Sequence, residues 1–171
     1  QPRFSPDGRK VLFVSDAQGG ENLHVLDLDE RDDEGEHEIR TLTEGKNNSY
    51  SSPEWAPDGE YVVATKSFGR RGKLWMWHVD GGSGIQLIDE PANVKTIGAA
   101  FGSDDRYVWF ARRSGDWQYN AIFPQYQIYY YDRDTGEQVT RTSRYGSAVR
   151  PTLSPDGKLM VYATRFETET G

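Results

Sequence analysis

A five-residue phrase repeats along this chain and constrains its fold more than any other feature. The phrase is an apolar residue, Ser or Ala, and then Pro-Asp-Gly, and it occurs at Phe4–Gly8, Trp55–Gly59 and Leu153–Gly157. A weaker fourth copy lies at Phe101–Asp105, and the shared Asp recurs every 46 to 52 residues. Self-similarity at a period of roughly 40–50 residues, with strand-like flanks, is typical of propellers and other repeat arrays.

Each copy of the phrase has the residues of a tight turn between two strands. Proline sets φ near about −65° at the first central position, aspartate tolerates the second, and glycine supplies a positive φ. In the weaker copy Ser103 replaces proline and Asp105 replaces glycine, and we expect Asp105 to adopt the left-handed region that Asp tolerates. The residues assigned to this structural turn motif are Pro6, Asp7, Gly8, Pro57, Asp58, Gly59, Asp104, Asp105, Pro155, Asp156 and Gly157.

Apolar and β-branched runs follow every turn. They are Lys10–Val14, Tyr61–Thr65, Tyr107–Ala111 and Leu159–Ala163. Because these runs do not alternate with polar residues, we expect both of their faces to be covered by neighbouring sheets. A buried helix is the competing interpretation, but the short length, the aromatic content and the bounding turns favour strands.

Two further strands are predicted in each complete repeat. The third strands are Asn22–Leu28, Lys73–Val79 and Gln127–Asp132, and the more polar fourth strands are Glu38–Thr43, Gly84–Ile88 and Glu137–Thr142. Hydrophobicity that fades from the second strand to the fourth is expected where outer strands face water on one side. No segment shows convincing helical periodicity, so each repeat is interpreted as one four-stranded blade.

The sequence therefore predicts an all-β fold, a partial β-propeller of four-stranded antiparallel blades within one domain. Three complete blades are expected at about 1–45, 46–91 and 92–145, and the start of a fourth at about 146–171. Propellers close with roughly four to eight blades. Open blade faces would expose apolar surface that monomers rarely tolerate. We therefore expect the remaining blades to lie in a longer polypeptide and to pack against this segment.

The amino-acid composition argues against several classes of binding partner and chemistry. The net charge of −7 gives no electrostatic basis for binding nucleic acid. No apolar run approaches the ~20 residues that span a bilayer, so membrane insertion is not expected. The absence of cysteine excludes disulfides and thiolate chemistry. Association into a homo-oligomer is left open by the sequence.

One long connection stands out from the turns. The segment Arg112–Tyr126 joins the second and third strands of the third blade, where the first blade uses only Asp16–Glu21. Long loops often carry function, and aromatic and Arg side chains dominate binding hot spots. A domain or subunit interface, local packing over its own blade and ligand contact are the three interpretations. The candidate interface residues are Arg112, Arg113, Trp117, Tyr119, Phe123 and Tyr126.

A shorter basic loop, Phe68–Lys73, occupies the equivalent place in the second blade. Contact with an acidic partner is one interpretation of its charge, and a solvated turn is the favoured one.

Groups that suggest chemistry elsewhere have structural explanations. The four recurring aspartates stand one per blade, too far apart for the converging pair that acid–base catalysis needs. His24 and His78 are interpreted as equivalent packing positions in successive third strands rather than as metal ligands. The acidic segment Asp27–Glu38 lacks the residue order of a calcium loop and is interpreted as a solvated hairpin.

Signatures of catalysis do not occur in this sequence. There is no Gly-x-Ser-x-Gly elbow, no phosphate-binding loop and no zinc pattern. No catalytic residue, cofactor or metal ligand is therefore assigned within this chain.

The repeated phrase, the aliphatic strand after it, and the following Gly-Gly-x-x-Leu and Asp-turn resemble the TolB-like β-propeller, a relative of the WD-type repeat. The resemblance covers essentially the whole chain. More narrowly, Ser52–Lys66, Lys73–His78, Gly81–Leu87 and Arg150–Lys158 look like the propeller that precedes the metal-dependent hydrolase domain of bacterial amidohydrolase-type proteins. The resemblance implies a hydrolase parent, in the periplasm or secreted, and a catalytic domain in the same polypeptide.

Three functions are compatible with this resemblance. The first is a non-catalytic scaffold that packs against an amidohydrolase-type domain of the same chain. The second is the gating propeller of a prolyl-oligopeptidase-type serine peptidase. The third is a free-standing periplasmic propeller that binds proteins, as TolB does. The segment that follows the completed ring would discriminate between them, through a His-x-His strand end, a Gly-x-Ser-x-Gly elbow or termination.

Overall fold

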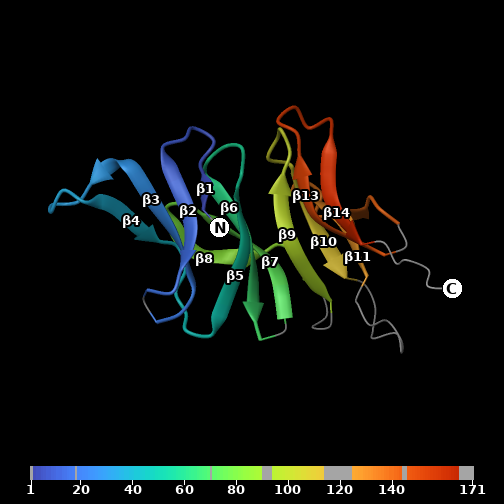
Figure 1. Ribbon diagram of the computed structural model, residues 1–171, viewed down its shortest axis with the longest axis horizontal. Helices are drawn as coiled ribbons and strands as arrows, with labels where there is room; N and C mark the ends of the chain where they lie inside the picture. The colour runs from blue at the N-terminus through green and yellow to red at the C-terminus, as the bar shows by residue number, and fades with distance from the viewer. Residues whose placement is uncertain are drawn as a thin grey trace.

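Four antiparallel sheets stand side by side along an arc, in the order of the chain (Figure 1). This computed structural model describes residues 2–17, 19–69, 71–89, 94–113, 125–143 and 146–165, and it contains no helix within those ranges. No helix long and apolar enough to cross a bilayer therefore occurs in this described part of the chain.

The first three sheets have four strands each, and the fourth has two described strands. The first sheet comprises β1 (Arg3–Phe4), β2 (Lys10–Ser15), β3 (Asn22–Arg31) and β4 (His37–Thr41). The second comprises β5 (Asn48–Trp55), β6 (Tyr61–Phe68), β7 (Arg71–His78) and β8 (Gly81–Gln86). The third comprises β9 (Lys95–Phe101), β10 (Tyr107–Arg113), β11 (Tyr126–Asp132) and β12 (Gln138–Thr140), and the fourth β13 (Ser147–Leu153) and β14 (Met160–Arg165).

Within every sheet each strand pairs with its neighbours in sequence. In each sheet, the turn formed by the repeated five-residue motif connects the first strand to the second. The first strands β1, β5, β9 and β13 therefore occupy equivalent edge positions. The outermost strands β4, β8 and β12 contain no buried residue among those described, in agreement with their polar sequences. The prediction of an all-β, partial propeller with four-stranded antiparallel sheets is confirmed.

The two ends of the sheets differ in their connections. At one end, called here the turn rim, lie the turns between first and second strands (top of Figure 1) and the links from third to fourth strands, of which the β3–β4 hairpin projects at the left. At the other end, called the loop rim, lie the links from second to third strands and from each sheet to the next (bottom of Figure 1). The loop rim includes the strand ends at Asn48, Phe68, Arg71, Lys95 and Arg113.

Adjacent sheets bury apolar side chains between them. Val62 and Val63 are both fully buried, although consecutive strand residues point to opposite faces. Val62 packs in the cluster between the first and second sheets, with Leu12 and Trp55, whereas Val63 packs in the cluster between the second and third sheets. The continuous apolar run of β6 is therefore explained by a neighbour on each side.

The arc is open at both ends. Val161 follows the shared Asp of its repeat by the same five residues as Leu12 and Val63, yet it is 73% exposed while they are fully buried. Phe4 is likewise 69% exposed, whereas Trp55 at the same position of the second repeat is 4% exposed. Both exposed side chains occupy positions that an adjacent sheet covers elsewhere in the chain.

Candidate functional site

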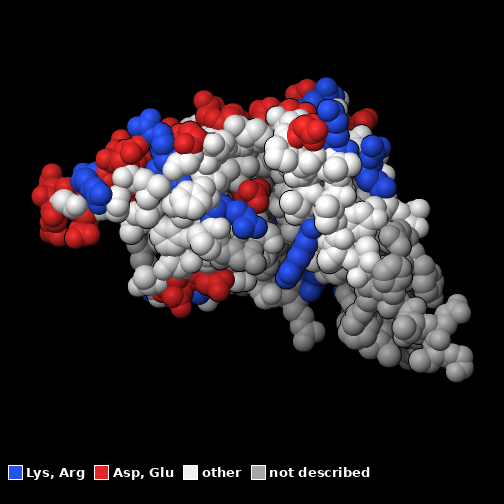
Figure 2. All heavy atoms as spheres, turned by 45° about the horizontal axis from the view of Figure 1, so that its top comes forward, with Lys and Arg blue, Asp and Glu red and all other residues white. Residues whose placement is uncertain are grey.

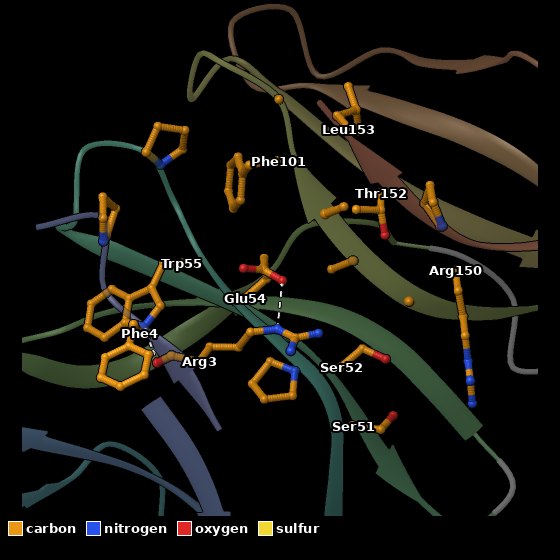
Figure 3. Close-up of a pocket in the computed structure, with 18 of the residues that line it drawn as sticks. Arg3, Phe4, Ser51, Ser52, Glu54, Trp55, Phe101, Arg150, Thr152 and Leu153 are labelled. Atoms are coloured by element: carbon orange, nitrogen blue, oxygen red, sulfur yellow. Dashed lines mark hydrogen bonds and ion pairs between the residues drawn. The ribbon is translucent and has the colours of Figure 1, made fainter. Parts of the chain in front are cut away.

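The edge strands β1, β5, β9 and β13 line a groove of about 1130 Å³ on the concave side of the arc (Figure 3). Its wall contains aromatic side chains, among them those of Trp55 and Phe101, together with aliphatic, hydroxyl and charged side chains. This groove is the candidate functional site, because it brings charged, hydroxyl and aromatic groups from four sheets together.

A β-bulge recurs in three of the groove-lining strands. In β5, Ser51 pairs with Thr65 and Glu54 with Val63, so two residues of β5 stand opposite one of β6. The bulged residues Ser52, Gly98 and Arg150 have φ values of 52°, 68° and 55°. A bulge leaves its extra residue out of the ladder and increases the local twist. All three residues line the groove.

Glycine fits this position in β9 for two reasons. Its φ is positive, and a Cβ at Gly98 would lie 3.4 Å from the Cα atom of Arg150 in the adjacent sheet. Ser52 and Arg150 hold the same left-handed conformation as non-glycine residues, which costs roughly 1 kcal/mol or more each. Arg150 is exposed and extends along the opposite side of the groove from Glu54 (Figure 3).

An ion pair crosses the groove between the first two sheets. The Arg3 guanidinium donates to the Glu54 carboxylate at 3.1 Å, and the Trp55 indole N–H donates to the Arg3 carbonyl oxygen at 3.0 Å. Burial raises the pKa of the Glu54 carboxyl, and the adjacent Arg3 opposes that shift. Because both side chains remain partly exposed, the pair contributes between about 0 and 1 kcal/mol to stability.

The raised pKa of Glu54 gives a pH prediction of definite sign. A carboxyl that binds its proton more tightly in the folded state adds stability as pH falls through the folded pKa, and the gain is complete below the unfolded value. The wild-type chain should therefore gain stability relative to Glu54→Gln between pH 7 and about 4.5. Urea midpoints of both proteins across this range measure the effect, and parallel pH profiles would contradict it.

The bulged residues and the Arg3–Glu54 pair were not predicted as a site from the sequence, whereas Pro6, Pro57 and Pro155 of the predicted turn motif also line the groove. Each bulged residue lies six positions before the shared Asp of its repeat, and in two repeats it directly precedes a proline, Pro53 or Pro151. Because the residue before proline has a restricted backbone, this X-Pro step was the signal for an irregular strand that the sequence contained. The Arg3–Glu54 pair joins two different repeats, so no spacing within one repeat indicates it.

The structure places the predicted turn residues at the turn rim. Gly8, Gly59 and Gly157 have φ values of 75°, 75° and 68°, and each donates its N–H to the carbonyl oxygen three residues earlier. The shared Asp of every repeat accepts the N–H two residues later. Asp7 and Asp156 also accept a hydrogen bond from the hydroxyl of the serine two residues earlier, and these hydrogen bonds lower the pKa of both carboxyls.

The prediction of a left-handed Asp105 is wrong. Asp105 does not have a positive φ, and the hydrogen bond that closes the other three turns is absent there among the described residues. Instead, the Arg133 guanidinium donates to the Asp105 carbonyl oxygen at 2.8 Å and to its carboxylate at 3.2 Å. Without proline and glycine, this connection is held by an arginine from the neighbouring turn.

Half of the candidate interface residues can be placed. Trp117, Tyr119 and Phe123 lie outside the described residues, whereas Arg112, Arg113 and Tyr126 end paired strands at the loop rim. The Arg112 guanidinium donates to the Gln138 side-chain oxygen at 3.1 Å and lies over the Tyr129 ring. Burial raises the pKa of the Tyr126 hydroxyl. Local packing accounts for Arg112, and the interface role of the set stays a prediction.

The two strand histidines are not equivalent, contrary to the prediction. His24 pairs with Phe13, stacks on its ring at 5.4 Å and is 4% exposed. His78 pairs instead with Tyr61, and its Nδ1 accepts the Asp80 N–H at the turn rim. His24 lies 17 residues after the shared Asp of its repeat and His78 lies 20 residues after its own, so the two histidines occupy different register positions.

Glu21 also lines the groove, where its carboxylate accepts the Tyr50 N–H at 3.2 Å, whereas the carboxylates of Asp132 and the Asp27–Glu38 hairpin do not line it. Asp132 accepts two hydrogen bonds from the Arg106 guanidinium, at 3.1 and 2.7 Å, which lower the pKa of the aspartate. Asp27 to Glu38 forms an exposed hairpin at the turn rim. No group of three or more His, Asp or Glu side chains suited to a metal ion occurs among the described residues. The groove therefore offers binding groups: a cation, an ion pair, hydroxyls and aromatic faces.

Comparisons with known proteins identify the fold and the family. The family model "TolB beta propeller domain" matches residues 1–169. Among curated proteins, the uncharacterized peptidase YuxL of Bacillus subtilis is 30% identical over 170 residues, which is 99% of this chain and 22% of that protein. The chain thus spans about a fifth of this relative.

Two solved structures illustrate the fold. TolB of Acinetobacter baumannii superposes with a TM-score of 0.70 at 22% identity, over 96% of this chain and 37% of that one. A puromycin-hydrolyzing peptidase of Mycobacterium tuberculosis superposes with a TM-score of 0.70 at 18% identity, over 94% of this chain and 24% of that one. At these identities the likeness concerns the fold alone. Since the family model covers nearly every residue, this chain belongs to the TolB β-propeller domain family.

Proposed function

We propose that this chain is a non-catalytic part of the propeller of a longer hydrolase, and that the hydrolase is a serine peptidase of the prolyl-oligopeptidase type. The supporting observation is the Bacillus relative, named as a peptidase, which matches 99% of this chain with 22% of its own length. In this arrangement the propeller packs against the catalytic domain and restricts which substrates reach it. The groove, with Arg150 on its wall, lies on the substrate path.

The open ends of the arc are consistent with this proposal. Val161 and Phe4 occupy register positions that adjacent sheets bury elsewhere in the chain. Further blades of the same polypeptide would cover both, and they are the first partners we propose.

An amidohydrolase-type catalytic domain is the second candidate, because Ser52–Lys66 and Arg150–Lys158 resemble the propellers of such proteins. The relatives named above include peptidases and no amidohydrolase, so the peptidase is preferred. A free-standing protein-binding propeller is the third, by similarity to TolB. A periplasmic or secreted location is proposed from the same resemblance.

The full polypeptide tests these alternatives by its activity and inhibition. We expect it to hydrolyse aminoacyl-4-nitroanilides, to lose this activity with a fluorophosphonate that modifies active-site serine, and to retain it with EDTA. Residues 1–171 alone should not hydrolyse these substrates. Inhibition by EDTA and not by the fluorophosphonate would instead support the amidohydrolase, and no hydrolysis of the aminoacyl-4-nitroanilides would overturn the proposal of a peptidase.

A further inference from the structure

Four charged side chains line the groove, and three of them hold a partner within the chain. Arg3 and Glu54 form the ion pair described above, and the Glu21 carboxylate accepts the Tyr50 N–H at 3.2 Å. Figure 2 shows acidic and basic side chains meeting in the hollow of this face, apart from the charged side chains along the turn rim. The fourth, Arg150, is exposed, and its guanidinium forms no ion pair or hydrogen bond with another described residue. The N–H donors of this guanidinium are thus open to a ligand.

The backbone holds the root of this arginine in a strained conformation. Arg150 has a φ of 55° at the bulge of β13, which glycine adopts without strain and arginine does not. The neighbouring strand approaches so closely that a Cβ at Gly98 would lie 3.4 Å from the Arg150 Cα atom. Non-glycine residues held in this region cluster at binding and active sites. A role of the side chain in the groove therefore explains arginine at this position better than the packing of the sheet does.

Hydroxyl groups lie on the groove wall together with this cation. Ser51 and Thr152 are exposed, Ser52 is half-buried, and none of the three hydroxyls hydrogen bonds to another described residue. In Figure 3 the Ser51 and Ser52 hydroxyls stand between Glu54 and Arg150. Because a hydroxyl can donate to an anion, these groups can add hydrogen bonds to one that Arg150 holds.

We propose that Arg150 binds a carboxylate of the peptide substrate in the groove, an inference that rests on the function proposed above. A guanidinium presents its donors in a planar fork that matches the two oxygens of a carboxylate, and such charge-assisted pairs are stronger than neutral hydrogen bonds. Glu54 does not compete for this guanidinium, because its carboxylate is paired with Arg3 at 3.1 Å. The carboxylate is the C-terminal group of the peptide or an acidic side chain, two sources of the same chemistry. Arg150 thereby selects carboxylate-bearing peptides among those that enter the propeller.

Peptide binding to the full polypeptide, inactivated beforehand with the fluorophosphonate, tests this role. The probes are dansyl-labelled penta-alanine with a free C-terminal carboxylate, the same peptide as its C-terminal amide, and the amide with aspartate in place of the fourth alanine. By fluorescence anisotropy we expect the free acid to bind at least about fivefold more tightly than the plain amide, since hydrogen bonds to charged groups contribute more than neutral ones. Equally tight binding of the aspartyl amide would assign the site to any carboxylate, and weak binding of that peptide would assign it to the C-terminus.

Two substitutions of Arg150 separate binding from folding. Arg150→Gln removes the charge and keeps a long polar side chain, whereas Arg150→Gly removes the side chain and suits the positive φ. Both should reduce the preference for the free acid to less than about twofold, and the glycine variant should keep the urea midpoint of the wild type because the strain is relieved.

The matched control is Lys158→Gln, which removes a cation from the turn between β13 and β14, outside the groove, and should leave the preference for the free acid unchanged. Equal affinity of the unsubstituted polypeptide for all three peptides, no binding of any of them, or a preference that survives Arg150→Gly would overturn the proposal.

The binding result and the activity result are independent. A polypeptide that hydrolyses nitroanilides but binds the free acid and the amide equally retains the proposed function and loses the role of Arg150. A polypeptide that prefers the free acid through Arg150 without hydrolysing nitroanilides retains the carboxylate site and loses the peptidase.

Discussion

Replacing Val63 by aspartate is expected to lower the free energy of unfolding by at least about 4 kcal/mol, because the new carboxylate would be buried without a partner. Val63 is fully buried between the second and third sheets, among Leu74, Val108 and Phe110. Domains of this size are stable by only about 5–15 kcal/mol. We therefore expect most of the stability to be lost, measured as the shift of the urea midpoint multiplied by the m-value.

The repeat supplies a control at the same register position. Val161→Asp makes the identical substitution five residues after the shared Asp of the fourth repeat, where 73% of the side chain is exposed. In the 171-residue chain this change should stay within about 0.5 kcal/mol of the wild type. In a longer polypeptide with a further sheet it should instead be as costly as Val63→Asp. Equal, small effects at both positions in the 171-residue chain would contradict the packing described here.

Trp55→Ala is expected to destabilise the chain by about 3–5 kcal/mol, the range for removal of a large aromatic side chain from a core. Trp55 is 4% exposed in the cluster between the first and second sheets, and its indole N–H donates to the Arg3 carbonyl oxygen. The substitution removes both the packing and the hydrogen bond that ties β5 to β1. Chemical denaturation of the variant measures the loss.

Two variants separate these contributions. Trp55→Phe retains most of the ring and loses the hydrogen bond, so it should cost less than Trp55→Ala, with about 1 kcal/mol assigned to the bond. Phe4→Ala alters the equivalent position of the first repeat, which is 69% exposed, and should be nearly neutral. A loss at Phe4 as large as that at Trp55 would show that exposure in this arc does not report packing.

Local sequence determines much of this fold. Proline and glycine at Pro6, Gly8, Pro57 and Gly59 restrict the backbone to one kind of turn, and the turn fixes the start of the following strand. The predicted second strands therefore coincide with β2, β6 and β10 to within three residues at each end. The turn at Asp105 could not be predicted in the same way, because without these residues a contact from Arg133 decides its shape.

The candidate site depends on neighbours that the sequence does not indicate. His24 and His78 follow the shared Asp of their repeats by 17 and 20 residues, so the offset that the strand register shows was already present in the sequence. The groove requires edge strands from four sheets to face one axis, and the Arg3–Glu54 pair joins residues 51 apart in sequence. Neither relation follows from propensity or periodicity within a repeat.

The recurrent bulge places one residue from each of three repeats in the groove wall and outside the strand ladder. Ser52, Gly98 and Arg150 occupy one position per repeat that faces the groove and stands outside the strand pairing. A hydroxyl, a bare backbone and a cation all satisfy the same left-handed conformation there. Substitutions at Ser52 or Arg150 would therefore change the polar groups that line the groove without altering the strand pairing, whereas a Cβ at Gly98 would lie 3.4 Å from the Cα atom of Arg150.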